Sequence, residues 1–262
     1  MLEFMDLGGL DTVIKKVGRF TEEALAALSF QVLWGLGYMQ VERRVHRDIK
    51  PANILCATDG AAKLTDFGLS KEVTTALMAK TFVGTFKHLS PERMQSERYS
   101  YPADIWAAGL VLLECALGRY PYPESSSTIG YVTTIVDGPV PVPVKGSKEA
   151  EEAGLADDFI DFIGSALQKE PEKRPTAVEL LESPWIARVL LSKGVNSVDG
   201  CRVVLRKFFE EKGLATKAEA GADPGLAMEG VAVGGGGGSS ISRSAVGEAV
   251  TGGALGGDGE ML

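Results

Sequence analysis

The stretch at residues 45–55, VHRDIKPANIL, constrains the fold most strongly, because it places charged and amide side chains between two segments whose apolar residues follow different patterns. Upstream, Thr21 is a candidate helix N-cap, and apolar residues then recur at helical spacing: Leu25, Leu28, Val32, Leu36 and Met39. They predict a helix with one apolar face over about five turns. Downstream, Asp59-Gly60 lies between two short apolar runs, which predicts a hairpin. The polar stretch is therefore expected to be a loop held between a core helix and a hairpin.

The rest of the chain reads as mainly helical. The apolar segment 103–117 is followed by Gly118, which predicts a buried central helix with a glycine C-cap. Glycines 8 and 9 predict a bend. Further helices are predicted around 129–136, 155–169 and 177–181, and a weaker amphipathic helix at 195–212. The expected fold class is mainly α with one short β-hairpin.

The C-terminal segment differs in composition from the rest. Residues 214–262 are rich in glycine, contain the run at 234–238 and lack aromatic side chains, so burial cannot offset the entropy of ordering them. We expect this tail to be disordered. The predicted organisation is a folded domain at 1–190, a weak helical extension at 191–213 and the tail at 214–262.

Charge and cysteine usage exclude several classes of protein. The formal net charge is −8, the tail contributes half of it, and no basic stripe suggests a nucleic acid or an anionic membrane as partner. The three cysteines are far apart, which favours reduced thiols over disulfides or a zinc site. No signal peptide is recognised, and the apolar stretch 105–117 is too short to span a membrane. These features predict a cytoplasmic protein.

The polar loop carries side chains suited to phosphoryl transfer, which needs a positioned hydroxyl, a metal ion on the phosphates and charge stabilisation at the γ-phosphate. Asp48 would accept or orient the hydroxyl proton, and Lys50 would steady the γ-phosphate. Asn53 would bind Mg²⁺ through its amide oxygen, and Asp66 would be the second metal ligand. One carboxylate and one amide suffice for Mg²⁺ beside the oxygens of ATP.

Several motifs together resemble the protein kinases and, within them, the MAP kinase kinases. They are HRDIKPAN at 46–53, DFG at 66–68, TFVGTFKHLSPERM at 81–94, ADIWAAGLVLLECALGRYPYP at 103–123 and EKRPTAVELLESPWI at 172–186. The resemblance runs from residue 2 to residue 185 and implies a two-lobed fold with ATP between the lobes. It covers the hinge and the helical large lobe. The small β-rich lobe, with its glycine-rich loop and strand lysine, is expected to be absent, and the chain to be an incomplete copy.

The resemblance also implies an ATP site. The segment LEFMD at residues 2–6 resembles the hinge, with Leu2 at the gatekeeper position and the backbone of Glu3 and Met5 meeting the adenine. Leu55 would form the floor of the adenine pocket. ATP and Mg²⁺ are the implied cofactors.

Further residues take supporting roles by the same resemblance. Arg47 would meet a phosphorylated activation-loop residue, and Thr85 would brace the side chains of Asp48 and Lys50. Asp104 would hold the catalytic-loop backbone, and Glu92 would pair with Arg174. The alternative is that this last pair consists of ordinary surface charges. The two histidines, His46 and His88, are expected to be structural.

The activation segment offers two candidate phosphorylation sites. Thr75 and Thr81 are separated by five residues, which resembles the pattern of plant-type MAP kinase kinases. A phosphate there could order the loop by pairing with Arg47. Alternatively they are ordinary exposed threonines, and Thr74 lies beside the first site.

The implied function is phosphorylation of serine or threonine, and of tyrosine by resemblance alone, in the activation loop of a MAP kinase. The implied partners are that MAP kinase substrate and an upstream MAP kinase kinase kinase. The alternatives are a non-catalytic binding module of the same cascade and a kinase of a neighbouring serine/threonine family.

Overall fold

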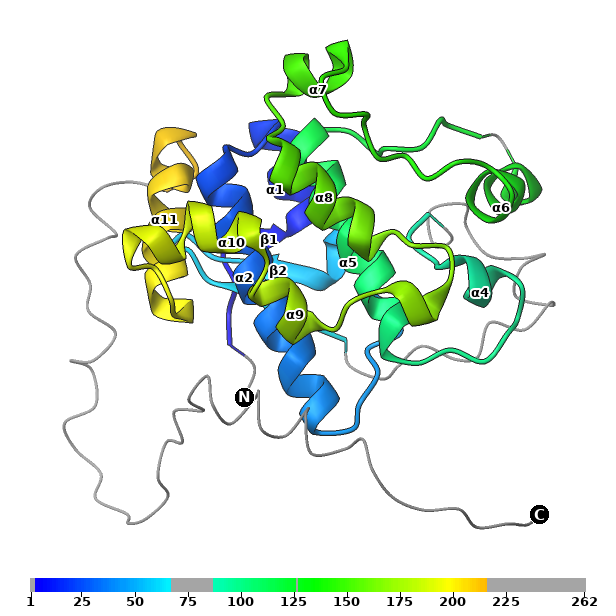
Figure 1. Ribbon diagram of the computed structural model, residues 1–262. Helices are drawn as coiled ribbons and strands as arrows, with labels where there is room; N and C mark the ends of the chain where they lie inside the picture. Colours follow the sequence, from blue (N-terminus) through cyan, green and yellow to red (C-terminus); the bar gives the residue numbers. More distant parts are fainter. Residues whose placement is uncertain (1–2, 67–86, 126, 216–262) are drawn as a thin grey trace, which may run out of the picture.

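The computed structural model describes residues 3–66, 87–125 and 127–215 of the chain (Figure 1). In chain order the elements are β1 (Gly8–Gly9), α1 (Leu10–Val17), α2 (Glu22–Val41), the 3₁₀ turn η1 (Pro51–Asn53), β2 (Ile54–Cys56), β3 (Ala62–Leu64), α4 (Pro91–Met94), α5 (Tyr101–Leu117), α6 (Thr128–Val136), α7 (Lys148–Ala153), α8 (Asp157–Ala166), η3 (Pro171–Lys173), α9 (Ala177–Leu181), α10 (Pro184–Val189), η4 (Leu191–Lys193) and α11 (Val198–Glu211). The predicted mainly α class with a short hairpin is confirmed. Most of the tail predicted to be disordered, from residue 216 on, lies outside the described residues.

The helix α2 passes through the centre of the molecule (Figure 1). Its side chains from Ala24 to Leu33 are buried without interruption, because α5, α9, α10, α11 and β3 pack around it. The prediction of a single apolar face was therefore too narrow. By length and composition α2 could also cross a bilayer, but it is mostly buried inside the protein, as a central core helix is.

The ends of the two core helices follow the predicted signals. The hydroxyl of Thr21 accepts a hydrogen bond from the backbone N–H of Ala24, at 3.4 Å, and caps α2. Gly118 has the left-handed backbone, with φ 69°, that ends α5. Three short helices, α4, α7 and α10, were not predicted, whereas α9, which is equally short, was; four to six residues are too few for a helical period to identify such helices consistently.

A three-stranded antiparallel sheet lies beside α2, in the order β1-β2-β3. The predicted hairpin is β2–β3, in which Ile54 pairs with Leu64 and Cys56 with Ala62. Gly8 also pairs with Cys56, so the segment read as a glycine bend contains a two-residue strand as well. Two residues are too few to show the alternation that identifies a strand.

The helix predicted weakly at 195–212 is α11, and it shares the core with the other helices. Cys201, Leu205, Phe208 and Phe209 are buried, and the Phe208 ring lies 4.8 Å from that of Phe20. The separate status of residues 191–213 stays a prediction.

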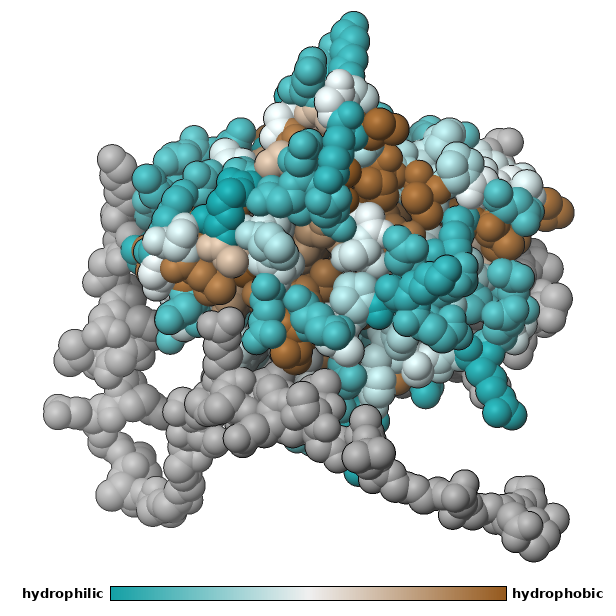
Figure 2. Space-filling model, viewed as in Figure 1, coloured by the Kyte–Doolittle hydropathy of each residue, from teal (hydrophilic) through white to brown (hydrophobic). Residues whose placement is uncertain are grey.

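Hydrophobic side chains also reach the surface. Figure 2 shows them gathered between the positions of α8 and α6, the region crossed by the proline-rich segment 138–143. Among the exposed apolar side chains, Ile129 and Val144 are 79% and 74% accessible, and Phe4, in the hinge-like segment, is 86% accessible. Exposed apolar side chains are common on folded proteins, because polar atoms alone do not cover the surface.

The hairpin turn and α11 touch at Gly60. This residue has φ 87°, and a Cβ atom built on it would lie 1.9 Å from the carbonyl oxygen of Arg202. The turn can approach the α11 backbone this closely only without a side chain.

We predict that Gly60→Ala destabilises the protein more than Gly194→Ala. Both residues have positive φ, but nothing lies within 4 Å of a Cβ atom on Gly194. The control should lose about 1–2 kcal/mol from backbone strain alone, whereas Gly60→Ala should lose about 1–3 kcal/mol more from overpacking. Urea unfolding followed by circular dichroism measures both, and equal losses would contradict the close packing of α11 on the hairpin.

Candidate active site

The loop between α2 and β2 is held by a buried carboxylate. Asp104, in the first turn of α5, accepts hydrogen bonds from the backbone N–H groups of His46, at 2.7 Å, and Arg47, at 2.8 Å. Arg47 has a left-handed backbone with φ 73°, an unfavourable conformation for a residue with a side chain. Asp104 therefore stabilises a strained turn just before Asp48.

Two polar side chains of the loop, those of Lys50 and Asn53, donate hydrogen bonds to the Asp48 carboxylate. Its Oδ2 atom accepts from Lys50 Nζ at 2.7 Å and from Asn53 Nδ2 at 2.8 Å. Asn53 Nδ2 also donates to the backbone carbonyl of Asp48, at 2.8 Å. Because the amide nitrogen of Asn53 is engaged in this way, its amide oxygen is the atom left for a metal ion. The side chains of Asp48 and Lys50 are 29% and 27% accessible, so a substrate can reach them.

The hairpin brings Asp66 to the same end of the sheet as Asn53. The ladder pair Ile54 and Leu64 is followed by a hydrogen bond from the Thr65 backbone N–H to the Asn53 carbonyl oxygen, at 3.0 Å. Asp66 comes next, exposed and with φ 64°. The two expected metal ligands thus flank the open end of one hairpin.

The hinge-like segment is fixed to the hairpin. Asp6 accepts from the Thr58 backbone N–H at 2.8 Å and from the Thr58 hydroxyl at 2.6 Å. Within that segment Glu3 is exposed, Met5 is buried, and the Met5 carbonyl accepts from the Gly8 N–H.

Leu55, the expected floor of the adenine pocket, lies opposite Gly9 in the β1–β2 ladder and is partly buried. The hinge-like segment, which leads into β1, thus lies next to β2, the central strand that carries Leu55.

Glu92 and Arg174 form a buried bidentate ion pair, with both N···O distances 2.8 Å. Their side chains are 3% and 0% accessible, so they are not ordinary surface charges. The remaining donors of Arg174 bind the carbonyl groups of Pro102, Gln168 and Lys169. The pair therefore ties α4 to the start of α5 and to the segment before α9.

Burial shifts the pKa of several groups in this region. It lowers the pKa of His46 and so favours a neutral ring, although the nearby Asp104 opposes the shift. Burial also raises the pKa of Asp104, against the effect of its two backbone donors. For Glu92, burial alone would raise the pKa, but the hydrogen bonds and charge of Arg174 outweigh it and the net shift is downward.

The second histidine, His88, lies 3.0 Å from Glu114 and packs edge-on against Tyr120. The side chain of Arg47 is exposed near the ring of Tyr99. Other expected site residues lie outside the described residues: Leu2, Phe67, Gly68, Thr75, Thr81 and Thr85.

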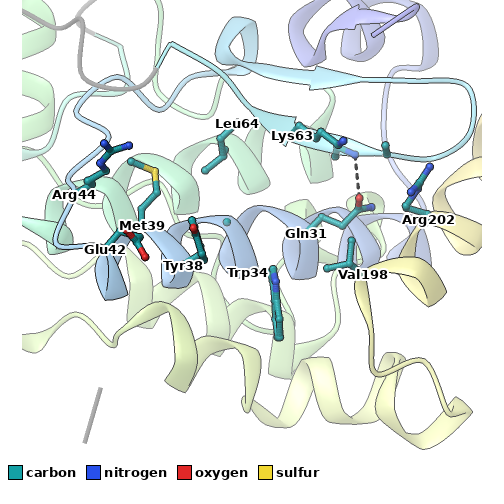
Figure 3. Close-up of a pocket in the computed structure, with 13 residues that line it drawn as sticks. Gln31, Trp34, Tyr38, Met39, Glu42, Arg44, Lys63, Leu64, Val198 and Arg202 are labelled. Atoms are coloured by element: carbon teal, nitrogen blue, oxygen red, sulfur yellow. Dashed lines mark hydrogen bonds between the residues drawn. The ribbon is translucent and has the colours of Figure 1, made fainter. Parts of the chain in front are cut away.

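A cavity of about 570 Å³ opens elsewhere, between α2, β3 and α11 (Figure 3). Trp34, Tyr38 and Leu64 are among its lining residues, and none of the expected site residues lines it. Beside it, the buried Gln31 accepts from the Ala62 N–H at 2.9 Å and donates to the Gly60 carbonyl at 3.1 Å. The role of Gln31 could not be predicted from the sequence, because an isolated amide in an apolar helix gives no sign of its partners.

Comparison with known proteins agrees with this geometry. A family model described as a protein kinase domain matches residues 1–186. The chain is 41% identical over 189 residues to mitogen-activated protein kinase kinase 3 of Arabidopsis thaliana and 44% identical over 194 residues to mitogen-activated protein kinase kinase 1 of the same plant. It is 42% identical over 194 residues to mitogen-activated protein kinase kinase SIPKK of Nicotiana tabacum. Each match covers 71% of this chain but only 35%, 53% and 52% of the respective relative.

The chain belongs to the protein kinase family. Its relatives are of the MAP kinase kinase type, which confirms the resemblance stated from the motifs. The helical core with its small sheet is consistent with the large lobe of that fold. The chain spans between about a third and a half of the length of these curated relatives.

We predict that Glu92→Gln costs about 3–5 kcal/mol of stability, because it leaves the Arg174 charge buried without its counter-ion. In the unmodified protein the lowered pKa of Glu92 stabilises the fold above the carboxyl's ordinary value of 4.5, and this contribution is lost as the pH falls through the lowered pKa. The variant should lack that acid-dependent component in urea unfolding.

The control is Glu170→Gln, which breaks the exposed pair with Lys173. It should change stability by no more than about 1 kcal/mol. Similar losses of stability in the two variants would show that burial of the Glu92–Arg174 pair does not determine its contribution to the free energy of unfolding.

Proposed function

We propose that this protein is an ATP-dependent protein kinase of the MAP kinase kinase type, which phosphorylates serine or threonine, and also tyrosine, in the activation loop of a MAP kinase. The observation that carries the proposal is the cluster in which Lys50 and Asn53 both donate to the Asp48 carboxylate. Asp66 is tethered beside this cluster by the hairpin. The names of the relatives support the choice of substrate class.

Each side chain of the cluster has a chemical role in this proposal. Asp48 orients the acceptor hydroxyl and takes up its proton, and Lys50 stabilises charge on the transferred phosphoryl group. Asn53 and Asp66 hold Mg²⁺ through an amide oxygen and a carboxylate, hard ligands that suit this ion. When bound, Mg²⁺ supplies neutralisation of the phosphate charge.

The adenine of ATP would contact the backbone of Glu3 and Met5, with Leu2 at the gatekeeper position and Leu55 beneath the ring. The hydrogen bonds between Asp6 and Thr58 support this assignment, because they fix the hinge-like segment against the turn that follows β2, the strand that carries Leu55.

Regulation would act through Thr75 and Thr81, phosphorylated by an upstream MAP kinase kinase kinase. Each phosphate adds roughly −1.5 to −2 charge, which the exposed Arg47 side chain can pair with. Thr85 would brace Asp48 and Lys50. Glu92, Asp104 and Arg174 would keep the surrounding backbone in place. We place the protein in the cytoplasm, with neither nucleic acid nor membrane as partner.

We predict that Asp48→Asn lowers phosphate transfer to a MAP kinase at least about 100-fold, because the variant cannot take up the hydroxyl proton. The KM for ATP should change little, since Asp48 contacts the acceptor rather than the nucleotide. Transfer from radiolabelled ATP to a MAP kinase that is itself inactive measures the effect.

The matched control is Asp199→Asn, at a side chain that is 91% accessible. It should retain full transfer. If the unmodified chain binds the MAP kinase, shows no thermal shift with Mg-ATP and transfers no phosphate, the protein is a binding module and the proposed function is wrong.

We also predict that Thr81→Ala reduces activation by an upstream kinase by at least about tenfold, because the phosphate that would order the loop is lost. Thr75→Ala should have a smaller effect and Thr74→Ala none. Mass spectrometry of the treated chain locates the phosphates, and phosphorylation confined to Thr74 would contradict the assignment.

A further inference from the structure

Arg93 lies in α4, directly after Glu92, and is only 7% accessible. Its guanidinium does not join the Glu92–Arg174 pair. Instead, an Arg93 Nη1 N–H donates a hydrogen bond to the backbone carbonyl oxygen of Arg47. A buried cation therefore contacts the residue that precedes Asp48.

This hydrogen bond completes the support of three consecutive peptide groups. The N–H groups of His46 and Arg47 donate to Asp104. The next peptide group joins Arg47 to Asp48; its carbonyl accepts from Arg93, and its N–H donates to Nδ1 of His46 at 3.4 Å. The orientation of that last group determines where the Asp48 side chain points. Among the described residues, Arg93 is the one side chain that donates a hydrogen bond to the carbonyl oxygen of this peptide group.

The surroundings of Arg93 suit an arginine and not a lysine. Its guanidinium carbon lies 4.6 Å from the centre of the Tyr99 ring, the geometry of a cation–π contact. Burial lowers the pKa of Arg93, and the negative charges of Asp104, Asp48 and Glu92 oppose that shift. A planar guanidinium can stack on the ring and donate to the carbonyl together, whereas an ammonium group is a single point charge.

The position of Arg93 is fixed from outside the loop. Its neighbour Glu92 is locked by Arg174, which also binds the backbone carbonyl groups of Pro102, in the first turn of α5, and Lys169, after α8. Because α4 has only four residues, a fixed Glu92 leaves Arg93 little freedom to move. The anchoring ion pair and the loop contact thus come from adjacent residues.

We propose that Arg93 is a positioning residue of this kinase: by holding the Arg47–Asp48 peptide group, it aims the Asp48 carboxylate at the acceptor hydroxyl. The catalytic half of this inference, that Arg93 aims Asp48 at the acceptor, rests on the proposed function. The structural half, that Arg93 holds the Arg47–Asp48 peptide group, rests on the contacts of Arg93 alone.

The structural half is tested by hydrogen exchange of the full chain, read at the amide of Asp48. Arg93→Met should speed exchange there about tenfold, which corresponds to the loss of one hydrogen bond. Arg93→Lys should restore part of the protection. Arg98→Met, at an exposed arginine near α4, is the matched control and should exchange like the unmodified protein.

The catalytic half is tested by steady-state kinetics on the same variants. Arg93→Met should lower kcat by about 10- to 100-fold, the effect of a small misplacement of a reacting group, with the KM for ATP within about twofold. Arg93→Lys should recover part of kcat. A residue that merely supported the fold would not give this separation of kcat from KM together with partial rescue.

The outcomes separate the two proposals. Unchanged exchange at Asp48 in Arg93→Met, or an equal rise throughout α2 and α5, overturns the positioning role. Faster local exchange with unchanged kcat also overturns it. Absence of phosphate transfer by the unmodified chain refutes the proposed function, and the exchange measurement then still decides whether Arg93 holds the peptide group.

Discussion

The buried carboxylate of Asp104 is the interaction on which the rest of the site depends. It lies at the start of α5, the helix that packs against α2 and α8, and it accepts from two consecutive backbone N–H groups of the loop. Hydrogen bonds to a charged group contribute about 1.5–3 kcal/mol each, enough to offset the cost of the left-handed backbone at Arg47. The hydrophobic core thereby determines the geometry of a polar, partly exposed loop.

The sheet also positions residues of the site. The loop ends in the turn η1 and enters β2, and the hairpin returns the chain to Asn53 through Thr65. The Asp48 cluster and Asp66 are consequently positioned by different elements: the first by α5 and the second by strand pairing. Both elements rest on α2, through α5 contacts on one side and the amide of Gln31 on the other.

Sequence patterns predicted the features that depend on local signals. The N-cap at Thr21, the C-cap at Gly118 and the hairpin around Asp59-Gly60 each follow from a few adjacent residues, and each is present. The uninterrupted burial of α2 from Ala24 to Leu33 could not be predicted in this way, because it depends on helices that come later in the chain. The burial of α11 was understated for the same reason, because it comes from contact with α2 and not from the composition of α11 itself.

The site residues also differ in whether the sequence could predict them. Motif spacing singled out Asp48, Lys50 and Asn53, since the chemistry requires those side chains at fixed intervals. It gave no sign of Gln31 or Arg93, which act on backbone groups of residues distant in sequence. A side chain that binds a carbonyl group leaves no partner pattern in the sequence, so such supports appear only when the fold is known.

The contact between Gly60 and α11 has a consequence for the tolerance of the chain to change. Surface turns usually accept insertions, but Gly60 of this turn is buried against the backbone of Arg202. Added residues would have to displace α11 or shift the register that pairs Ile54 with Leu64, and that register sets the interval between Asn53 and Asp66. A helix about 140 residues further along the chain thus limits the length of a loop that would otherwise be free to vary.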